Sequence, residues 1–255
     1  MANHPRSPAI GHVRECSTLS SARDGEVPPS SLADFGVFAL GAAMQFIAVY
    51  WAVPAAMAHG LETMPAWMLV SVPLIFLPII AASVLLWRCE GSSATWIERL
   101  RFGCPSRSDF GWGMAAVLGL FAGSGVLFAV ADAFDLNTSP PFAREVAPLT
   151  ADRWWIAAIW LVYWPINILS EELAWRGVIL PRMERRYGER AWLINAASWL
   201  GFHLAFGPGN NLILLPTILL TPWAAQRTKS TWIGGLIHTA LSLPGFIALA
   251  LGLAG

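Results

Sequence analysis

The sequence predicts an all-α fold, a polytopic integral membrane helix bundle with about seven transmembrane helices. Three observations predict it. Of the 255 residues, 56% are hydrophobic and 13% are charged, about half the charged fraction of an ordinary soluble domain. Apolar stretches long enough to cross a hydrocarbon core of about 30 Å recur along the chain. Basic residues gather in alternate connections between these stretches, as expected of loops that stay in the cytoplasm.

The first third of the chain divides into a tail and membrane helices. Residues 1–34 are rich in Ser, Pro and Arg and contain no long apolar run, so we predict that they form a disordered cytoplasmic tail. The N-terminal transmembrane helices and their loops occupy residues 35–153. Residues 88–109 place aromatic and aliphatic side chains among charges, which predicts a short helix in the membrane interface. The three apolar stretches of this region are residues 35–59, 65–87 and 110–131.

Residues 154–255 form a second membrane region with four apolar stretches. The first of them ends in a group of charged residues, and a basic connection follows it. A Gly-Pro-Gly-Asn-Asn sequence at residues 207–211 predicts a turn between the second and third stretches. The four predicted spans are residues 154–176, 191–206, 212–225 and 232–255.

The loop charges predict how the chain lies in the membrane. With seven spans, thirteen Lys and Arg residues fall in the tail and the loops on its side, whereas Arg144 and Arg153 fall on the other side. This distribution predicts a cytoplasmic N-terminus and an outside C-terminus. All but one of the sixteen basic residues are arginine, a bias that indicates a GC-rich bacterial genome and so the bacterial inner membrane. The net charge is zero, so we expect no nucleic-acid partner.

Two adjacent glutamates stand near the end of the fourth predicted span, in the sequence Ser170-Glu-Glu-Leu-Ala-Trp-Arg-Gly177. On a helix, Glu172 and Arg176 are four residues apart and can pair along one face. Glu171 points about 100° away, which leaves its carboxylate for another task. Ionisable residues inside a membrane are costly and mark functional sites. One glutamate is therefore predicted to be structural and its neighbour chemical.

Two histidines, His203 and His238, also lie inside predicted spans. At about 1.5 Å per residue, they lie roughly 18 Å and 9 Å from the cytoplasmic ends of their helices, and Glu171 lies at least about 8 Å in. All three can therefore meet in the cytoplasmic half of the membrane. Each histidine alone is equally explained by a hydrogen bond to a neighbouring helix. Together the three resemble a hydrolytic site, in which a carboxylate and an imidazole activate water and a second imidazole stabilises an oxyanion.

These residues also resemble a known family, the intramembrane proteases of the CAAX-protease and bacteriocin-processing (CPBP) group, which are related to the eukaryotic prenyl-protein endopeptidase. The resemblance covers residues 154–242. The family's first motif is Glu-Glu-x-x-x-Arg, its second Phe-x-x-x-His and its third His-x-x-x-Asn. The corresponding segments here are Glu171-Glu172-x-x-x-Arg176, Trp199-x-x-x-His203 and His238-x-x-x-Ser242.

The resemblance implies a role for each catalytic position. Glu171 and His203 are expected to activate the attacking water, and His238 with Ser242 to hold the oxyanion. Serine stands where the family has asparagine, and its hydroxyl is shorter and offers one donor where the amide offers two. The change at Ser242 is therefore expected to lower activity, alter the substrate or mark a member that no longer cleaves.

The resemblance implies supporting roles for three further residues. Glu172 and Arg176 are expected to fix the end of their helix. Trp199 stands in place of phenylalanine and is expected to keep an aromatic wall beside the site.

Metal use is left open by the sequence. Glu171, His203 and His238 together are a set that could bind zinc, and the family is often called a metalloprotease. However, the sequence has no His-Glu-x-x-His motif that would place two ligands on one helix. A metal-free mechanism that depends on glutamate is the favoured alternative.

The leading hypothesis is a peptidase, an intramembrane endopeptidase that hydrolyses peptide bonds near the cytoplasmic face. Its partners would be a peptide or protein substrate, with or without a lipid anchor, and membrane lipid. The alternative is a non-catalytic membrane scaffold or bacteriocin-immunity protein of the same fold, for which Ser242 would be drift. A small transporter that uses the buried Glu and His as a proton relay is a third reading, but no inverted repeat supports it.

Overall fold

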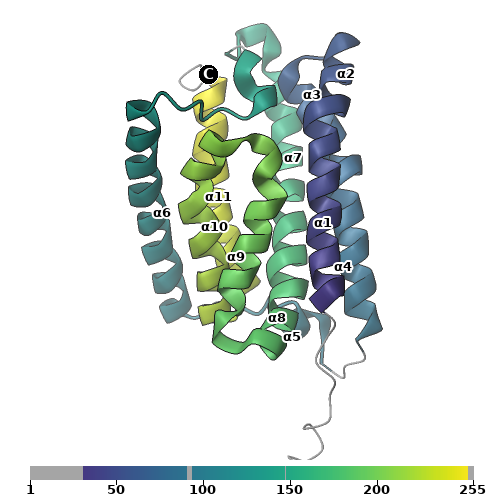
Figure 1. The fold of residues 1–255 in the computed structure, drawn as a ribbon, viewed down its shortest axis with the longest axis vertical. Helices are drawn as coiled ribbons and strands as arrows, with labels where there is room; N and C mark the ends of the chain where they lie inside the picture. Colours follow the sequence, from purple (N-terminus) through teal and green to yellow (C-terminus); the bar gives the residue numbers. More distant parts are fainter. Residues whose placement is uncertain (1–30, 91–93, 147, 252–255) are drawn as a thin grey trace, which may run out of the picture.

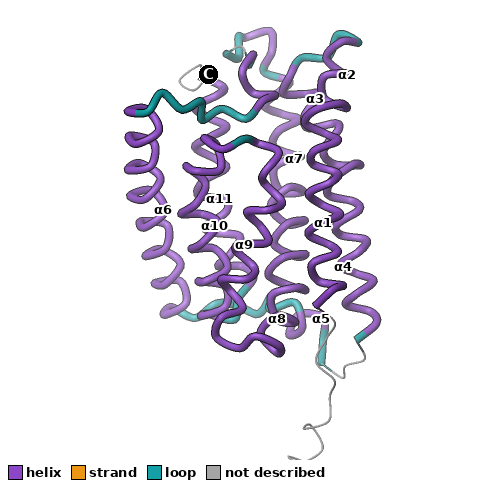
Figure 2. The backbone as a smooth tube through the Cα atoms, viewed as in Figure 1, coloured by secondary structure: helices purple, strands orange, loops and turns teal. Residues whose placement is uncertain are grey.

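The structure, a computed structural model, describes residues 31–90, 94–146 and 148–251. Within these residues the chain forms helices and loops and no strand (Figure 2), as the predicted all-α class requires. Residues 1–30 of the predicted tail lie outside the described residues. The last four residues of the predicted tail, 31–34, instead form the first turn of α1.

Two long helical stretches open the described chain. The first joins α1 (Ser31–Ile47), a π-helical turn (Ala48–Ala52) and α2 (Val53–Ala58). The second joins α3 (Thr63–Ser71), a π-helical turn (Val72–Phe76) and α4 (Leu77–Cys89). The short α5 (Trp96–Arg99) lies in the segment predicted to hold an interfacial helix, and α6 (Arg107–Ala133) follows it. All of the spans predicted for this region therefore fall on helices.

The second region begins with α7 (Trp155–Glu172), which continues through the π-helical turn η5 (Leu173–Ile179) into α8 (Leu180–Tyr187). Its other long helices are α9 (Ala191–His203), α10 (Pro208–Thr228) and α11 (Thr231–Ala250). The turn expected at residues 207–211 was too long, because α10 starts at Pro208. Proline fits the first turn of a helix, where its missing N–H has no acceptor to serve.

Four stretches of the described chain are long and apolar enough to cross a membrane, and they are Ser31–Ala58, Thr63–Cys89, Arg107–Ala133 and Thr231–Ala248. The other three predicted spans are helices but do not meet the same criterion. The helix α9 has only 13 residues, α7 ends in two glutamates, and α10 carries polar side chains along its length. The chain therefore has the character of a multi-pass membrane protein, and the number seven stays a prediction.

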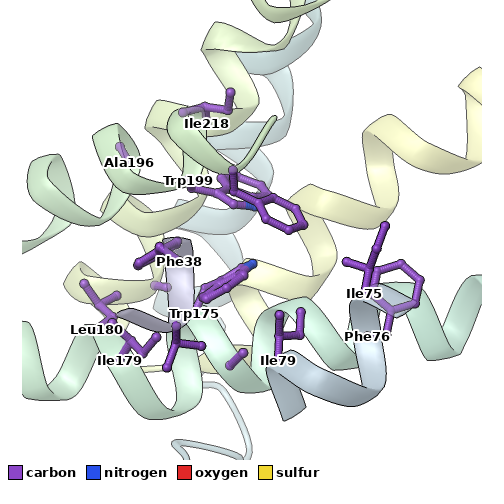
Figure 3. Close-up of a cluster of buried hydrophobic side chains, with 14 of the residues drawn as sticks. Phe38, Ile75, Phe76, Ile79, Trp175, Ile179, Leu180, Ala196, Trp199 and Ile218 are labelled. Carbon is purple, nitrogen blue, oxygen red and sulfur yellow. The ribbon is translucent and has the colours of Figure 1, made fainter. Parts of the chain in front are cut away.

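The long helices lie side by side in one bundle (Figure 1). The core forms where α1, α4, η5 and α9 meet, and the ring of Phe38 stacks on that of Trp175 with 4.1 Å between ring centroids. Figure 3 shows Trp175 and Trp199 among the aliphatic side chains of this cluster. The π-helical turn η5 begins directly after the two glutamates, and such turns are frequent at functional sites.

The start of α1, α5 and α8 lie at one end of the bundle, and the C-terminus lies at the other (Figure 1). We call the first the arginine-rich end, because it carries the basic loops. It is held by ion pairs between sequence-distant segments: Arg182 pairs with Asp34 and Glu90. Arg101 Nη1 also lies 2.7 Å from Glu184 Oε1. Asp34, in the first turn of α1, is buried in this ion-pair cluster.

The Glu184 cluster predicts a specific dependence of stability on pH. Burial raises the pKa of the Glu184 carboxyl, but the hydrogen bonds from Arg101 and Lys229 lower that pKa further, to below its ordinary value. The ion pairs therefore stabilise the fold above the ordinary glutamate pKa of about 4.3 and lose this effect as the pH falls through the lower, folded-state pKa. The apparent melting temperature in detergent should fall on acidification, and less steeply in Glu184→Gln. Equal slopes for the two proteins would contradict this account.

Candidate active site

The Glu171 carboxylate is held by two indole groups at the end of α7. Glu171 is only 4% exposed. Its Oε2 accepts hydrogen bonds from Trp199 Nε1 at 2.9 Å and from Trp175 Nε1 at 3.3 Å. Both donors bind the same oxygen, so Oε1 is the oxygen left to accept a proton from another group. An acceptor held in this way is preorganised without being neutralised by a cation.

Its neighbour Glu172 makes a different set of contacts. Glu172 Oε1 lies 3.1 Å from Arg176 Nη1, the pair that the spacing predicts. The same oxygen lies 3.0 Å from His238 Nδ1 on α11, a contact that the sequence did not predict. Glu172 therefore joins α7 to α11 and orients the His238 ring, as carboxylates commonly do for functional histidines.

The Glu172 carboxylate fits only because α11 presents a glycine to it. A Cβ atom on Gly234 would lie 2.3 Å from Glu172 Oε2, whereas a Cβ atom on Gly235 would have no neighbour closer than 4.0 Å. Small residues allow helices to pack closely, and the structure requires one at Gly234 and not at Gly235.

We predict that Gly234→Ala destabilises the protein by about 1–3 kcal/mol, the usual cost of overpacking a core. The added methyl group would push the Glu172 carboxylate away and weaken its bonds to Arg176 and His238. The apparent melting temperature of the purified protein measures the effect, and Gly235→Ala is the matched control. Equal losses in the two variants would show that close contact with Glu172 is not what Gly234 provides.

Trp199 on α9 contacts every predicted catalytic group except Ser242. In addition to its bond to Glu171, its carbonyl oxygen lies 2.9 Å from His203 Nδ1. Its ring centroid lies 5.2 Å from that of His203 and 5.4 Å from that of His238. The guanidinium carbon of Arg176 lies 3.7 Å from the centroid of the Trp199 ring. The indole is thus more than the aromatic wall that the sequence suggested.

The predicted catalytic residues Glu171, His203, His238 and Ser242 all line one cavity of about 260 Å³. They come from three helices, α7, α9 and α11. The Ser242 hydroxyl donates a hydrogen bond to the His238 carbonyl oxygen at 3.0 Å, so it is engaged by its own helix. Sequence reasoning missed Gln45 and Thr217, which also line the cavity. The sequence feature that could have identified them is a polar residue within an apolar stretch.

The three residues that could bind zinc are not arranged as a ligand set in this structure. Among the residues that the structure describes, no group of three or more His, Cys, Asp or Glu side chains is placed to hold a metal ion. One carboxylate oxygen of Glu171 serves two indoles, and Glu172, not Glu171, contacts His238. Glu171, His203 and His238 share a cavity, but their arrangement does not fit a metal-ligand set.

Comparison with known proteins supports the motif-based resemblance. Residues 153–243 match the family model of the type II CAAX prenyl endopeptidase Rce1-like proteins. The search of curated proteins and the search of solved structures gave no match. The matched segment starts just before α7, ends just after Ser242 and includes all three motifs. It supports a membrane peptidase that acts on a peptide or protein. Over residues 153–243, this chain therefore matches the Rce1-like family of type II CAAX prenyl endopeptidases, as the three motifs predict.

Proposed function

We propose that this protein is an intramembrane endopeptidase in which Glu171 and His203 activate water. The observation that carries the proposal is the shared cavity, since three helices bring Glu171, His203 and His238 to its lining. All three side chains are buried, and buried ionisable groups in a membrane protein are retained for function. The family match over residues 153–243 supports the same reaction class.

The hydrogen bonds define how each group would act on the water. A carbonyl oxygen only accepts, so His203 Nδ1 carries a hydrogen toward Trp199 O, which leaves Nε2 as an acceptor. A water held between His203 Nε2 and Glu171 Oε1 would attack the peptide carbonyl carbon. Its proton would pass to Glu171 and then to the leaving amine, so that the peptide C–N bond breaks and a carboxylic acid and an amine form.

His238 would stabilise the negative charge that develops on the carbonyl oxygen. Glu172 binds its Nδ1, so the ring's other nitrogen, Nε2, is the one available to the substrate. A protonated His238 would donate from Nε2 to the oxyanion, the kind of preorganised donor that contributes strongly to acyl-transfer catalysis. Glu172 and Arg176 act as positioning residues in this scheme, and no step depends on a metal ion.

The composition of the chain and its exposed apolar surface indicate that the reaction takes place in a membrane. Large apolar side chains on the outer faces of α6 and α7 are exposed, which supports lipid as the surrounding solvent. We place the protein in a bacterial inner membrane as a multi-pass protein, with its N-terminus in the cytoplasm and its C-terminus outside. The substrate would be a peptide or protein, with or without a lipid anchor. Cleavage near the cytoplasmic face stays a prediction based on helix depth.

One observation favours the alternative of a non-catalytic scaffold or immunity protein. The Ser242 hydroxyl is bonded to its own helix instead of facing an oxyanion, and a scaffold would tolerate this. The enzyme hypothesis requires that His238 alone, or a rotated Ser242, suffices at this position.

The proposal is tested by incubating purified, detergent-solubilised protein with a mixed peptide library and mapping cut sites by mass spectrometry. We expect the parent protein to cleave, and Ser242→Asn to cleave at least as fast. Cleavage by Ser242→Asn alone would identify an enzyme disabled at its oxyanion site. Silence of both proteins would overturn the peptidase assignment in favour of the scaffold. Loss of cleavage with a chelator and its return with Zn²⁺ would contradict the metal-free scheme.

A further inference from the structure

The cavity extends from the catalytic groups toward one end of the bundle only. Glu171, Trp199 and His238 are among the residues that line it. It also reaches Trp67, four residues after the start of α3, and Phe142, in the short helix Pro141–Glu145. Both segments belong to the end of the bundle that carries the C-terminus (Figure 1). We call this the cavity end.

On the other side, the catalytic groups are separated from the arginine-rich end by packed side chains. Trp175, Glu172 and Arg176 are at most 1% exposed. Gly234 of α11 closes against Glu172, and the Trp175 ring stacks on Phe38. This layer contains the buried ion pair of Glu172 and Arg176 and the stacked rings of Trp175 and Phe38. A substrate cannot approach through it without unpacking the core.

The charges of the two ends indicate which side of the membrane each faces. The arginine-rich end carries the basic loops around α5 and α8 and the connection after α10. The loops of the cavity end carry Arg144 and Arg153 together with several acidic residues. Because basic loops stay in the cytoplasm, the arginine-rich end is cytoplasmic and the cavity end faces outside.

Three buried polar atoms of residues that line the cavity lack a hydrogen-bond partner among the described residues: Gln45 Oε1, Trp164 Nε1 and Thr217 Oγ1. Gln45 is 1% exposed and Thr217 is 2% exposed, and both line the cavity. Among the described residues, neither Gln45 Oε1 nor Thr217 Oγ1 has a hydrogen-bond partner. A buried polar group without a partner costs about 1–3 kcal/mol. A peptide main chain could bind both atoms. Its N–H group can donate to the amide oxygen of Gln45, and its carbonyl oxygen can accept from the hydroxyl of Thr217.

We propose that the substrate is a peptide segment that enters from the outside face of the membrane through the cavity end, with Gln45 and Thr217 as positioning residues for its main chain. The segment would run past Trp67 and Phe142 to reach Glu171, so apolar or aromatic side chains would suit it. Exported peptides and the outer parts of membrane-anchored proteins have this access, whereas cytoplasmic peptides do not. This inference rests on the proposed peptidase function for its substrate, but the direction of entry can be measured separately.

Cysteine accessibility measures the direction of entry without any assay of activity. Thr217→Cys is placed in a full-length protein whose Cys16, Cys89 and Cys104 are replaced by serine. Bacterial spheroplasts are then treated with a small, membrane-impermeant methanethiosulfonate reagent. We expect modification from outside, whereas Arg186→Cys, at the arginine-rich end, should react only after permeabilisation. Modification of Thr217→Cys only from the cytoplasmic side, or not at all, would overturn the inference, as would outside labelling of Arg186→Cys.

The role of Thr217 is tested by kinetics on a peptide that the parent cleaves. Thr217→Val should raise KM by about fivefold to tenfold, as expected for loss of one hydrogen bond, with little change in kcat, and Thr217→Ser should restore KM. Thr221→Val is the matched control, because Thr221 is equally buried and unpartnered on α10 but does not line the cavity. Equal effects at both positions would overturn the positioning role. A parent that does not cleave would refute the peptidase assignment, while the labelling result would still decide the side of entry.

Discussion

Glu171→Gln is expected to lower kcat by about 10²- to 10⁴-fold, the usual contribution of a general base. Glutamine has nearly the same shape, and its amide oxygen can still accept from Trp199 and Trp175, so the bundle should stay folded. Its side chain cannot take a proton from water, which is the function assigned to this carboxylate. The measurement is kcat on one identified peptide, with the apparent melting temperature recorded for the same preparation.

Glu189→Gln provides the control for this substitution. Glu189 is exposed in the connection between α8 and α9, so the same chemical change there should leave kcat unaltered. A kcat for Glu171→Gln that matches the control would mean that the carboxylate does not activate water. The role would then have to pass to His203 alone.

Arg176→Met should cause the largest loss of stability, about 3–5 kcal/mol, because it leaves a buried carboxylate without its main cationic partner. Arg176 is 1% exposed, pairs with Glu172 and covers the Trp199 ring. Methionine keeps much of the volume but none of the charge. The apparent melting temperature in detergent should fall steeply, and cleavage should be lost with the folded protein.

The double variant Glu172→Gln with Arg176→Met shows whether Arg176 stabilises the protein through its charge or through its packing. Removing both charges of a buried pair is far less costly than removing one, so the double variant should melt above Arg176→Met. An apparent melting temperature as low as that of the single variant would show that Arg176 acts mainly through its packing on Trp199.

Much of the fold was predictable because hydrophobic length and loop charge are local properties of the sequence. Within the described residues the predicted spans fall on helices, and the four-residue spacing of Glu172 and Arg176 predicted their ion pair. Contacts between distant residues were not predictable in this way. One example is the ion pair of Asp34 on α1 with Arg182, 148 residues away.

The sequence identified the candidate catalytic residues but not Gln45 and Thr217, nor the contacts that join the residues of the site. Three motifs identified Glu171, His203 and His238, and the structure places all of them on one cavity. The bond between Glu172 and His238 depends on the close approach of α7 and α11 at Gly234. The central place of Trp199 depends on its indole N–H, which phenylalanine in the family motif lacks. Neither follows from the spacing of residues along one helix.

Counting residues from helix ends predicts a depth for the catalytic groups but not the side from which they are reached. That depth predicts that Glu171, His203 and His238 lie in the cytoplasmic half of the membrane and that cleavage occurs near that face. The direction of access depends on which end of the bundle is sealed by side-chain packing. Here the packed layer includes Glu172 and Arg176, so in our proposal the motif that contributes Glu171 also closes the site on the side of the arginine-rich end.

The most direct test of the account compares cleavage of the mixed peptide library by the parent protein, by Glu171→Gln and by His203→Ala, with all three shown to be equally folded. Cut sites are mapped by mass spectrometry. The account predicts a defined set of cuts by the parent and the loss of the same cuts in both variants. Cuts that persist in both variants would contradict it, because the proteolysis would then come from another site or another protein.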